Sequence, residues 1–333
     1  MLRYHAEGIN SLPYFYASGE EDKMILLQQM LALFALMLIG FFMGKKDVLD
    51  KATTKKISWI VINVANVSLI LQAGLDNKNE IAPTKLLLVG GIAVGMYVVL
   101  MLLAILLPIL LRIERKNYGI YRTMLIFSNI GFMGIPLLRA IAGSEAVLYA
   151  ALFQFPFNIL LYTYGIAAIQ QTEDLEPSAK KGGFRWKSML NVGVLACVFA
   201  LIFFFGKVDM PNFVDTVLLN LSNLTAPLSM LVIGQSFTEF QLKDLFTDSK
   251  LVLFAAIKLL VIPIAGLFLL QQFIADGTIL TVCLVMLGTP VASMTAMLAQ
   301  QYDSNYELAS KGVALTTILS VVTIPLVSAI MGL

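Results

Sequence analysis

Charged residues are scarce in this chain of 333 residues. Asp, Glu, Lys and Arg make up 13% of it, whereas a soluble domain carries roughly 25%. Hydrophobic residues account for 59%, which leaves too few polar side chains to cover a water-facing surface. The 23 basic residues nearly balance the 21 acidic ones, so the chain has no strong field to attract nucleic acid. We therefore expect neither a soluble fold nor a nucleic-acid partner.

Residue types that bind metals or carry catalysis are also scarce. The chain holds one histidine, His5, and two cysteines, Cys197 and Cys283, which lie in separate apolar runs. A disulfide or a Cys/His metal site would need other spacing and more ligands. There are no paired acids, no histidine in an apolar run and no phosphate-binding glycine loop. We expect no enzyme activity, no metal site and no cofactor.

Apolar runs long enough to cross a bilayer are abundant, since a span needs about 20 residues. The sequence predicts an all-α membrane protein with ten transmembrane helices at 24–44, 55–75, 85–111, 119–141, 146–170, 187–206, 213–236, 249–272, 277–299 and 307–331. Residues 1–23 form an extramembrane extension in this interpretation. A connector at 171–186, with Pro and paired Gly, separates a first five-helix repeat (24–170) from a second (187–333).

The distribution of Lys and Arg predicts the orientation, because cytoplasmic loops near spans collect basic residues. One side of the predicted topology holds 6 of them: Arg3, Lys23, Lys78, Lys85, Arg139 and Lys207. The other side holds 16: Lys45, Lys46, Lys51, Lys55, Lys56, Arg112, Arg115, Lys116, Arg122, Lys180, Lys181, Arg185, Lys187, Lys243, Lys250 and Lys311. The second side is therefore cytoplasmic. Both termini are expected to face the outside of the cell membrane.

An odd number of helices in each half turns the second half upside down, so any repeat is an inverted one. Three short segments recur in the same order. Residues 42–47 resemble 204–209, residues 63–67 resemble 223–227, and Gly134-Ile135-Pro136 resembles Gly288-Thr289-Pro290. Together they indicate two inverted repeats.

The third pair of segments interrupts the fourth and ninth helices. Glycine and proline disfavour a continuous helix, and irregular backbone at membrane depth occurs only inside protein or beside a wet cavity. A simple kink is one interpretation of each segment. Because the interruptions are paired, we favour a midplane binding site in which a new half-helix begins at each proline. Two half-helix N-termini suit an anion such as a carboxylate.

Polar side chains near the interruptions complete the candidate site. Gln154 and Asn158 lie four residues apart on one helical face, where they either line the cavity or join two helices. Ser128 and Thr295 add neutral hydrogen-bonding groups. The predicted substrate-binding residues are Asn129, Gly131, Gly134, Pro136, Gln154, Asn158, Lys258, Thr289, Pro290 and Ser293.

Lys258 is the one basic residue that the topology leaves inside a span. A cation there is a functional candidate by default. It could pair with a bound anion, cap backbone carbonyls at the broken helices, or extend its long stem to the cytoplasmic edge. The acidic residues, in contrast, all fall in loops or at the ends of spans. This pattern argues against a carboxylate-based site for a coupling sodium ion or proton.

Several of these segments together resemble the auxin efflux carrier family. They are the interrupted segment 127–138, the run Gln154-Phe155-Pro156-Phe157-Asn158, residues 223–234, residues 289–292 with 297–302, and the last helix with Ser320 and Pro325. The resemblance covers residues 24–333. It implies ten helices in two inverted repeats, with the fourth and ninth crossing at their breaks, and an elevator mechanism. Many relatives carry proline in the second helix, where this chain has Val67.

We expect a secondary transporter of small organic anions, like the family's bacterial permeases. A malate-like dicarboxylate is favoured over an auxin-like aromatic monocarboxylate, and an anion receptor that moves nothing is the rival from another class. The expected partners are the substrate and the lipid bilayer. A homodimer is compatible with the sequence.

Overall fold

The computed structural model describes residues 20–76, 81–170, 192–239 and 242–333. Within these ranges every regular element is a helix, and an isolated antiparallel bridge joins Ser128 to Val291. Most of the predicted extension (1–23), the connector (171–186) and the start of the sixth predicted helix fall outside the described residues.

Seven helices of the described chain are long and apolar enough to cross a membrane. They span Leu27–Lys45, Ala52–Leu75, Pro83–Leu110, Ile130–Gln170, Asn212–Ser236, Ser249–Leu270 and Tyr306–Met331. Two shorter apolar helices cover Leu195–Gly206 and Gly277–Gly288. The all-helical membrane fold is thus confirmed at this level, and the arrangement as ten spans in inverted repeats stays a prediction.

The first part of the chain contains three long helical segments and one that is interrupted. The long ones are α1, then α2 with α3, then α4. The interrupted one starts with α5, resumes after Ile126 and turns sharply at Gly143 (φ 72°). The bounds are α1 Glu20–Lys45, α2 Lys51–Ile60, η1 Val61–Ala65, α3 Asn66–Asp76, α4 Pro83–Leu110, η2 Arg115–Asn117, α5 Tyr118–Ile126, η3 Ile130–Gly134, α6 Ile135–Leu160, η4 Leu161–Gly165 and α7 Ile166–Gln170.

The second part has a similar succession, with a two-residue turn between α10 and α11 and a longer interruption further on. The predicted helix 277–299 is two helices, α14 and α15, with Thr289–Ala292 between them. The bounds are α9 Val192–Gly206, α10 Asn212–Ser222, α11 Thr225–Ser236, η5 Phe237–Glu239, η6 Leu242–Phe246, α12 Ser249–Ala256, η7 Ile257–Val261, α13 Ile262–Leu270, α14 Gly277–Gly288, α15 Ser293–Gln301 and α16 Tyr306–Met331.

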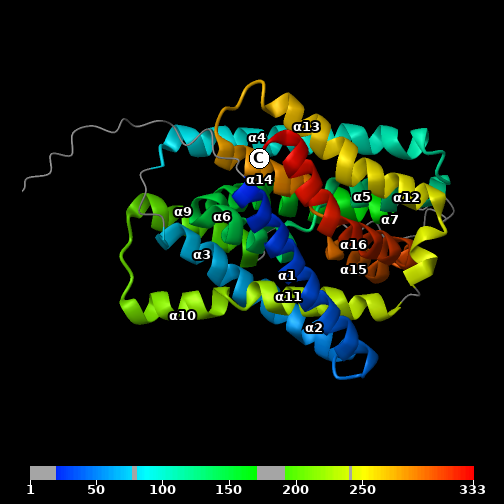
Figure 1. Cartoon of the computed structure of the whole chain (residues 1–333), viewed down its shortest axis with the longest axis horizontal. Helices are drawn as coiled ribbons and strands as arrows, with labels where there is room; N and C mark the ends of the chain where they lie inside the picture. The colour runs from blue at the N-terminus through cyan, green and yellow to red at the C-terminus, as the bar shows by residue number, and fades with distance from the viewer. Residues whose placement is uncertain (1–19, 77–80, 171–191, 240–241) are drawn as a thin grey trace, which may run out of the picture.

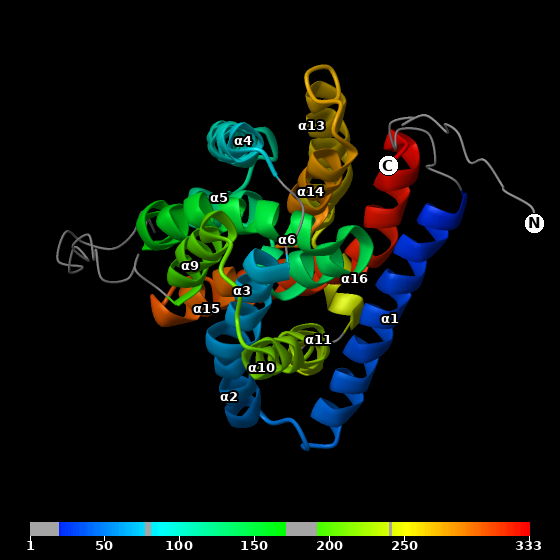
Figure 2. The same cartoon turned by 90° about the vertical axis from the view of Figure 1, so that its left-hand side faces the viewer.

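The helices pack mainly within two groups. In one, α1 lies along α11, and α3 packs against α9 and α10; in the other, α4, α5, α6, α7 and α12–α16 pack together. Figure 1 shows α1 running obliquely past α11, and Figure 2 places α4 and α13 at the opposite edge from α10 and α2. Gly40 and Gly234 allow α1 and α11 to approach closely, since a Cβ at either position would overlap backbone of the other helix.

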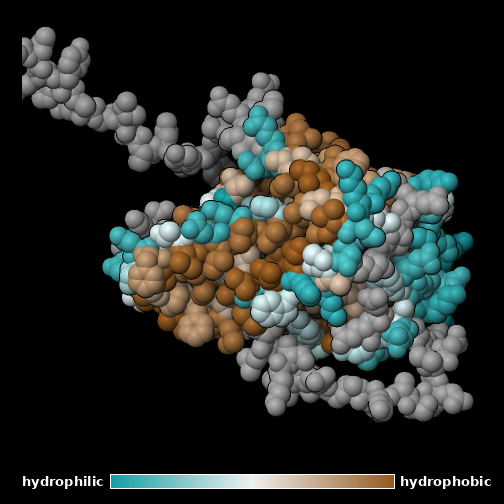
Figure 3. Space-filling model, turned by 90° about the horizontal axis from the view of Figure 1, so that it is seen from below, coloured by the Kyte–Doolittle hydropathy of each residue, from teal (hydrophilic) through white to brown (hydrophobic). Residues whose placement is uncertain are grey.

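Large apolar side chains cover much of the outside of these groups. Figure 3 shows a broad hydrophobic face with hydrophilic residues gathered toward its ends. On α4, Leu87 and Leu110 are each about three-quarters exposed, at 76% and 75%. Leucine at such exposure in a run of this length is typical of a surface that contacts lipid.

Candidate functional site

The two interrupted helices meet at their breaks. α5 ends at Ile126 and helical structure resumes at Ile130, while α14 ends at Gly288 and α15 begins at Ser293. The N–H of Asn129 donates to the carbonyl oxygen of Pro290 at 2.7 Å, and the N–H of Ala292 donates to the carbonyl of Phe127 at 2.9 Å. These two bonds form the antiparallel bridge between Ser128 and Val291. Each break therefore supplies backbone partners to the other.

Side chains satisfy further backbone groups at the crossing. The Oδ1 of Asn129 accepts from the N–H of Phe132 at 3.3 Å, which makes Asn129 an N-cap. The N–H of Val291 donates to Thr316 Oγ1 at 3.1 Å. Such partners are essential because unpaired backbone groups in an apolar interior cost several kcal/mol each.

A cavity of about 270 Å³ opens beside the crossing. Its volume suits a small organic molecule. It is lined by Ile62, Asn63, Asn66, Ser128, Asn129, Ile130, Gly131, Phe132, Gln154, Phe157, Asn158, Leu161, Tyr162, Val192, Gly193, Ala292, Ser293, Met294 and Met297. Among the described residues this lining is neutral, with no Asp, Glu, Lys, Arg or His.

Three buried amide atoms of the lining have no hydrogen-bond partner among the described residues. They are Asn66 Oδ1, Asn129 Nδ2 and Gln154 Oε1. Leaving such an atom unpaired costs about 1–3 kcal/mol. A polar ligand in the cavity would remove that cost. The amides of Asn66 and Gln154 flank Gly131, where a Cβ would lie 3.7 Å and 3.9 Å from their nitrogens.

Three of the helical segments that line the cavity contain a π-helical turn. These turns are η1, η3 and η4, which contribute Ile62, Asn63, Ile130–Phe132, Leu161 and Tyr162 to the lining. A π turn inserts one residue and changes which side chains face inward, and such turns are frequent at functional sites. A fourth, η7, carries Lys258.

The structure brings five of the ten predicted site residues together. Asn129, Gly131, Gln154, Asn158 and Ser293 line the cavity. Asn158 Nδ2 also donates to the carbonyl oxygen of Gln154, one turn back on the same helix, at 2.8 Å. Of the other predicted residues, Gly134, Pro136, Thr289, Pro290 and Lys258 do not line it.

The expectation that a half-helix begins at each proline is wrong. In the first break the helix resumes at Ile130, and Pro136 follows the π turn as the second residue of α6. A proline lacks an N–H and crowds the carbonyl four residues before it, and the wide π turn accommodates both effects. In the second break Pro290 lies within the non-helical segment, three residues before α15 begins. The half-helix ends therefore belong to Ile130 and Ser293.

Lys258 is buried behind the crossing, with 2% of its surface exposed. Its Nζ donates to Ser128 Oγ at 2.8 Å and to the carbonyl of Leu125, in the last turn of α5, at 3.3 Å. Of the three placements that the sequence allowed, extension to the cytoplasmic edge is wrong. The observed contacts correspond to capping at a broken helix.

Asn63 and Asn66 are lining residues that the sequence did not assign to the site. Both belong to the segment that predicted the repeat, and amides inside an apolar span were the signal. Asn66 is 7% exposed, and it reaches the cavity because α3 packs against α6 and η1 packs against α11. That packing joins distant parts of the chain.

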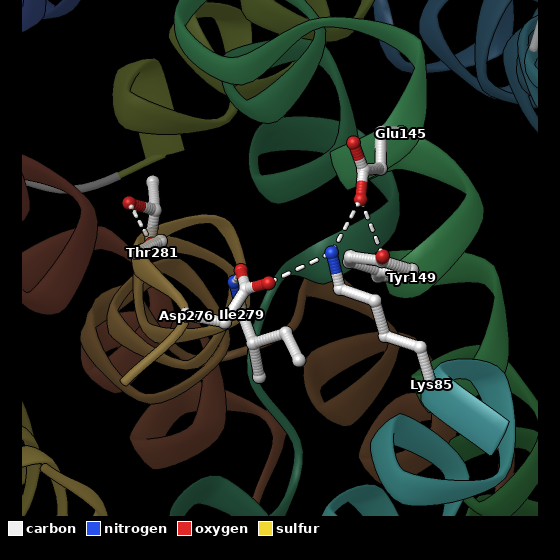
Figure 4. A network of polar contacts seen from close by, with 7 residues as sticks. Lys85, Glu145, Tyr149, Asp276, Ile279 and Thr281 are labelled. Atoms are coloured by element: carbon white, nitrogen blue, oxygen red, sulfur yellow. Dashed lines mark hydrogen bonds and ion pairs between the residues drawn. The ribbon is translucent and has the colours of Figure 1, made fainter. Parts of the chain in front are cut away.

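Figure 4 shows a second polar cluster, whose residues do not line the cavity. Lys85 of α4 places its Nζ 3.0 Å from Glu145 Oε1 of α6 and 2.7 Å from Asp276 Oδ2, at the start of α14. The hydroxyl of Tyr149 donates to the same Glu145 oxygen. The cluster joins three helices of one packing group. Within the described residues no group of three or more His, Cys, Asp or Glu could hold a metal ion.

Comparisons with known proteins show similarity to membrane transporters. An uncharacterized transporter of Methanocaldococcus jannaschii is 24% identical over 311 residues, which cover 91% of this chain and 98% of the relative. An uncharacterized transporter of Methanothermobacter thermautotrophicus is 24% identical over 312 residues, with the same coverage of 91% and 98%. The family model described as "Membrane transport protein" matches residues 25–328. The chain therefore belongs to this family of membrane transporters, the auxin efflux carrier family that its motifs resemble.

Proposed function

We propose that this protein is a secondary carrier of small organic anions and that the cavity beside the crossing is its substrate site. A malate-like dicarboxylate is the favoured substrate. Membership of a transporter family supports the transport function. The position of two half-helix N-termini at one neutral cavity supports an anionic substrate.

The observation that carries the proposal is the pairing of these N-termini. Ile130, Gly131 and Phe132 begin one half-helix, Ser293 and Met294 begin the other, and all five line the cavity. The first N–H groups of a helix have no carbonyl partner within it, and the helix dipole makes that end positive. At the first end the N–H of Ile130 already donates to the carbonyl of Ser128 at 2.8 Å, and that of Phe132 to Asn129 Oδ1 at 3.3 Å. A carboxylate between the two ends would therefore accept from the N–H of Gly131 on one side and from those of Ser293 and Met294 on the other. The unpaired Nδ2 of Asn129 adds a side-chain donor.

An aromatic monocarboxylate is the second candidate, favoured by the apolar part of the lining. Phe132, Phe157, Met294 and Met297 line the cavity together with the amides. A flat ring could pack against these side chains while its carboxylate meets the crossing. A dicarboxylate would instead place its second charged group among the amides of Asn66 and Gln154.

For the transport cycle we infer an elevator, in which one packing group slides against the other. The group with α1, α2, α3, α9, α10 and α11 would be the scaffold, and the group with both broken helices would carry the substrate. The cavity is lined by residues of both groups, Asn66 from one and Asn129 from the other. Sliding at such a boundary would expose the site to one side of the membrane and then the other.

We combine this mechanism with the transmembrane topology that the sequence predicts. The proposal comprises ten spans in two inverted five-helix repeats (24–170 and 187–333), both termini outside the cell membrane, and assembly as a homodimer in the bilayer. The matching interruptions, one in each half of the chain, support the inverted repeat.

The test is transport by the purified protein in proteoliposomes. Labelled malate, lactate and indole acetate would be offered with and without an imposed membrane potential. We expect saturable uptake of at least one acid, and competition by its unlabelled form. Saturable binding in detergent without flux in liposomes would identify an anion receptor instead. If none of the three acids binds or is transported, the proposal of an anionic substrate is overturned.

A further inference from the structure

Lys258 stands directly behind a residue of the cavity wall. Its Nζ lies 2.8 Å from Ser128 Oγ, and Ser128 lines the cavity whereas Lys258 does not. Ser128 is itself 3% exposed and is fixed by its place in the bridge with Val291. Ser128 thus connects Lys258, which lies in η7 between α12 and α13, to the substrate site.

The chemistry of this contact determines the direction of the Ser128 hydroxyl. A lysine ammonium has three donors and no acceptor, so the hydroxyl oxygen must be the acceptor in the bond to Lys258. The hydroxyl has a single proton, and that proton cannot point toward Nζ. Because Ser128 lines the cavity, the hydroxyl can donate into it. Lys258 therefore makes Ser128 a donor toward any acceptor bound there.

The charge near this contact favours an anion on the cavity side. Lys258 donates also to the carbonyl of Leu125, in the last turn of α5, where a helix end carries partial negative charge. Among the described residues, no acidic side chain lies within ion-pair distance of Lys258. A carboxylate next to Ser128 would be the nearest full negative charge, with one hydroxyl between it and the ammonium group.

We propose that Lys258 is a positioning residue of the substrate site, which holds the Ser128 hydroxyl as a hydrogen-bond donor to a substrate carboxylate. The inference rests on the proposed function, because it requires an organic anion in the cavity. This role differs from direct pairing of Lys258 with the substrate, because Lys258 does not itself line the cavity. It also differs from a purely structural role at the end of α5, which would leave substrate affinity unchanged.

A double-variant comparison separates these roles. The affinities of malate, lactate and indole acetate would be measured on purified Ser128→Ala, Lys258→Gln and the protein with both changes. Lys258→Arg serves as the conservative variant, since arginine keeps the charge and the donors. Lys250→Gln is the matched control: Lys250 lies in the first turn of the same helical segment and its Nζ donates to the carbonyl of Arg112 at 2.6 Å, but it is exposed and does not line the cavity. Thermal stability would be recorded for every variant.

Loss of one charge-assisted hydrogen bond predicts that Ser128→Ala weakens affinity about tenfold. Lys258→Gln should weaken it several-fold, Lys258→Arg should restore most of the loss, and Lys250→Gln should match the wild type. The combined variant should bind no worse than Ser128→Ala alone, because Lys258 acts through the hydroxyl.

Two results would overturn the inference while leaving the proposed function intact. One is a combined variant whose loss is the product of the single losses, which would give Lys258 its own route to the substrate. The other is a Lys258→Gln protein of lower thermal stability that binds all three acids as the wild type does. A wild-type protein that binds none of the acids would refute the proposed function and, with it, this inference.

Discussion

The N–H of Asn129 donates a 2.7 Å hydrogen bond to the carbonyl oxygen of Pro290, so each broken helix is completed by the other. Asn129 comes from the first half of the chain and Pro290 from the second. The same two segments contribute Asn129 and Ser293 to the cavity. The site is therefore complete only when the two halves of the chain meet at the crossing.

This relationship predicts unequal effects for two proline substitutions. Pro290 blocks continuation of α14 and keeps Thr289 extended, at ψ 149°. With Pro290→Ala the helix can extend into the crossing, and we expect transport to fall at least about tenfold, since small displacements at a binding site have effects of that order. Pro136 does not line the cavity, and the helix has already resumed at Ile130. Pro136→Ala should therefore reduce transport by less than about threefold. Uptake per molecule of folded carrier in proteoliposomes measures both. Equal losses would show that the position of the break does not matter.

Gly131 should be intolerant of a side chain for reasons of space in the cavity. A methyl group there would enter the lining between the amides of Asn66 and Gln154, at ordinary contact distances of 3.7 Å and 3.9 Å from their nitrogens. Gly131→Ala is therefore expected to fold normally and to bind substrate about tenfold or more weakly.

Gly134→Ala is the matched control for this change. Its methyl group would meet Ile130, Val285 and Met286 at 3.5–3.6 Å, outside the lining. Substrate affinity, measured alongside thermal stability, should separate the two variants. If Gly131→Ala bound substrate with wild-type affinity, the cavity would not be the substrate site.

The sequence predicted the helices and the presence of a crossing, but not the residues at which the broken helices resume. Long apolar runs identify α1, α4 and α16 because the bilayer sets their length. Paired Gly and Pro segments indicated where helices are interrupted. The residue at which each half-helix begins was wrong, because a π turn after Asn129 absorbs the effect of Pro136. Such turns depend on packing and leave no periodic pattern.

The sequence also could not predict which distant segments contact each other. Asn66 and Gln154 flank Gly131 only because α3 and α6 pack together, and one sequence does not specify that register. Lys258 was identified as unusual from its charge alone, but its partners Ser128 and Leu125 follow from the position of η7 behind the crossing.

The predicted orientation can be tested with introduced cysteines. Cys197 and Cys283 are buried, so the wild-type protein should react little with a membrane-impermeant maleimide. Lys46 and Asp209 are exposed in loops that the charge distribution assigns to opposite sides. Asp209→Cys should react in intact cells, whereas Lys46→Cys should react only after the cells are opened. Because α1 separates Lys46 from the N-terminus, that result also places the N-terminus outside. The reverse labelling pattern would invert the topology.

Asp276 has two separable roles at the start of α14. Its Oδ1 accepts from the N–H of Ile279 at 3.0 Å, and its Oδ2 pairs with Lys85 at 2.7 Å. Asp276→Asn keeps the helix cap and removes the ion pair, which is worth less than about 1 kcal/mol because both side chains are about one-third exposed. Asp276→Ala removes both contacts and should cost about 1 kcal/mol more.

The check on Asp276 is the apparent melting temperature of each variant at low and high salt. High salt should narrow the difference between wild type and Asp276→Asn, since screening weakens exposed ion pairs. The difference between Asp276→Asn and Asp276→Ala should persist, because it comes from the cap. Identical melting temperatures for the two variants would show that the cap contributes nothing.

The neutral lining makes a prediction about the driving force. The part of the cavity wall that the structure describes contains no carboxylate that could bind a coupling sodium ion or proton. A monovalent anion carried alone should therefore respond to the membrane potential, at about 2.3 kcal/mol per charge for each 100 mV. In proteoliposomes, 100 mV positive inside should raise the accumulation ratio roughly fifty-fold, and replacing sodium by potassium should change nothing. Uptake that requires sodium, or that takes up a proton with each substrate, would show that the carrier couples through residues outside this cavity.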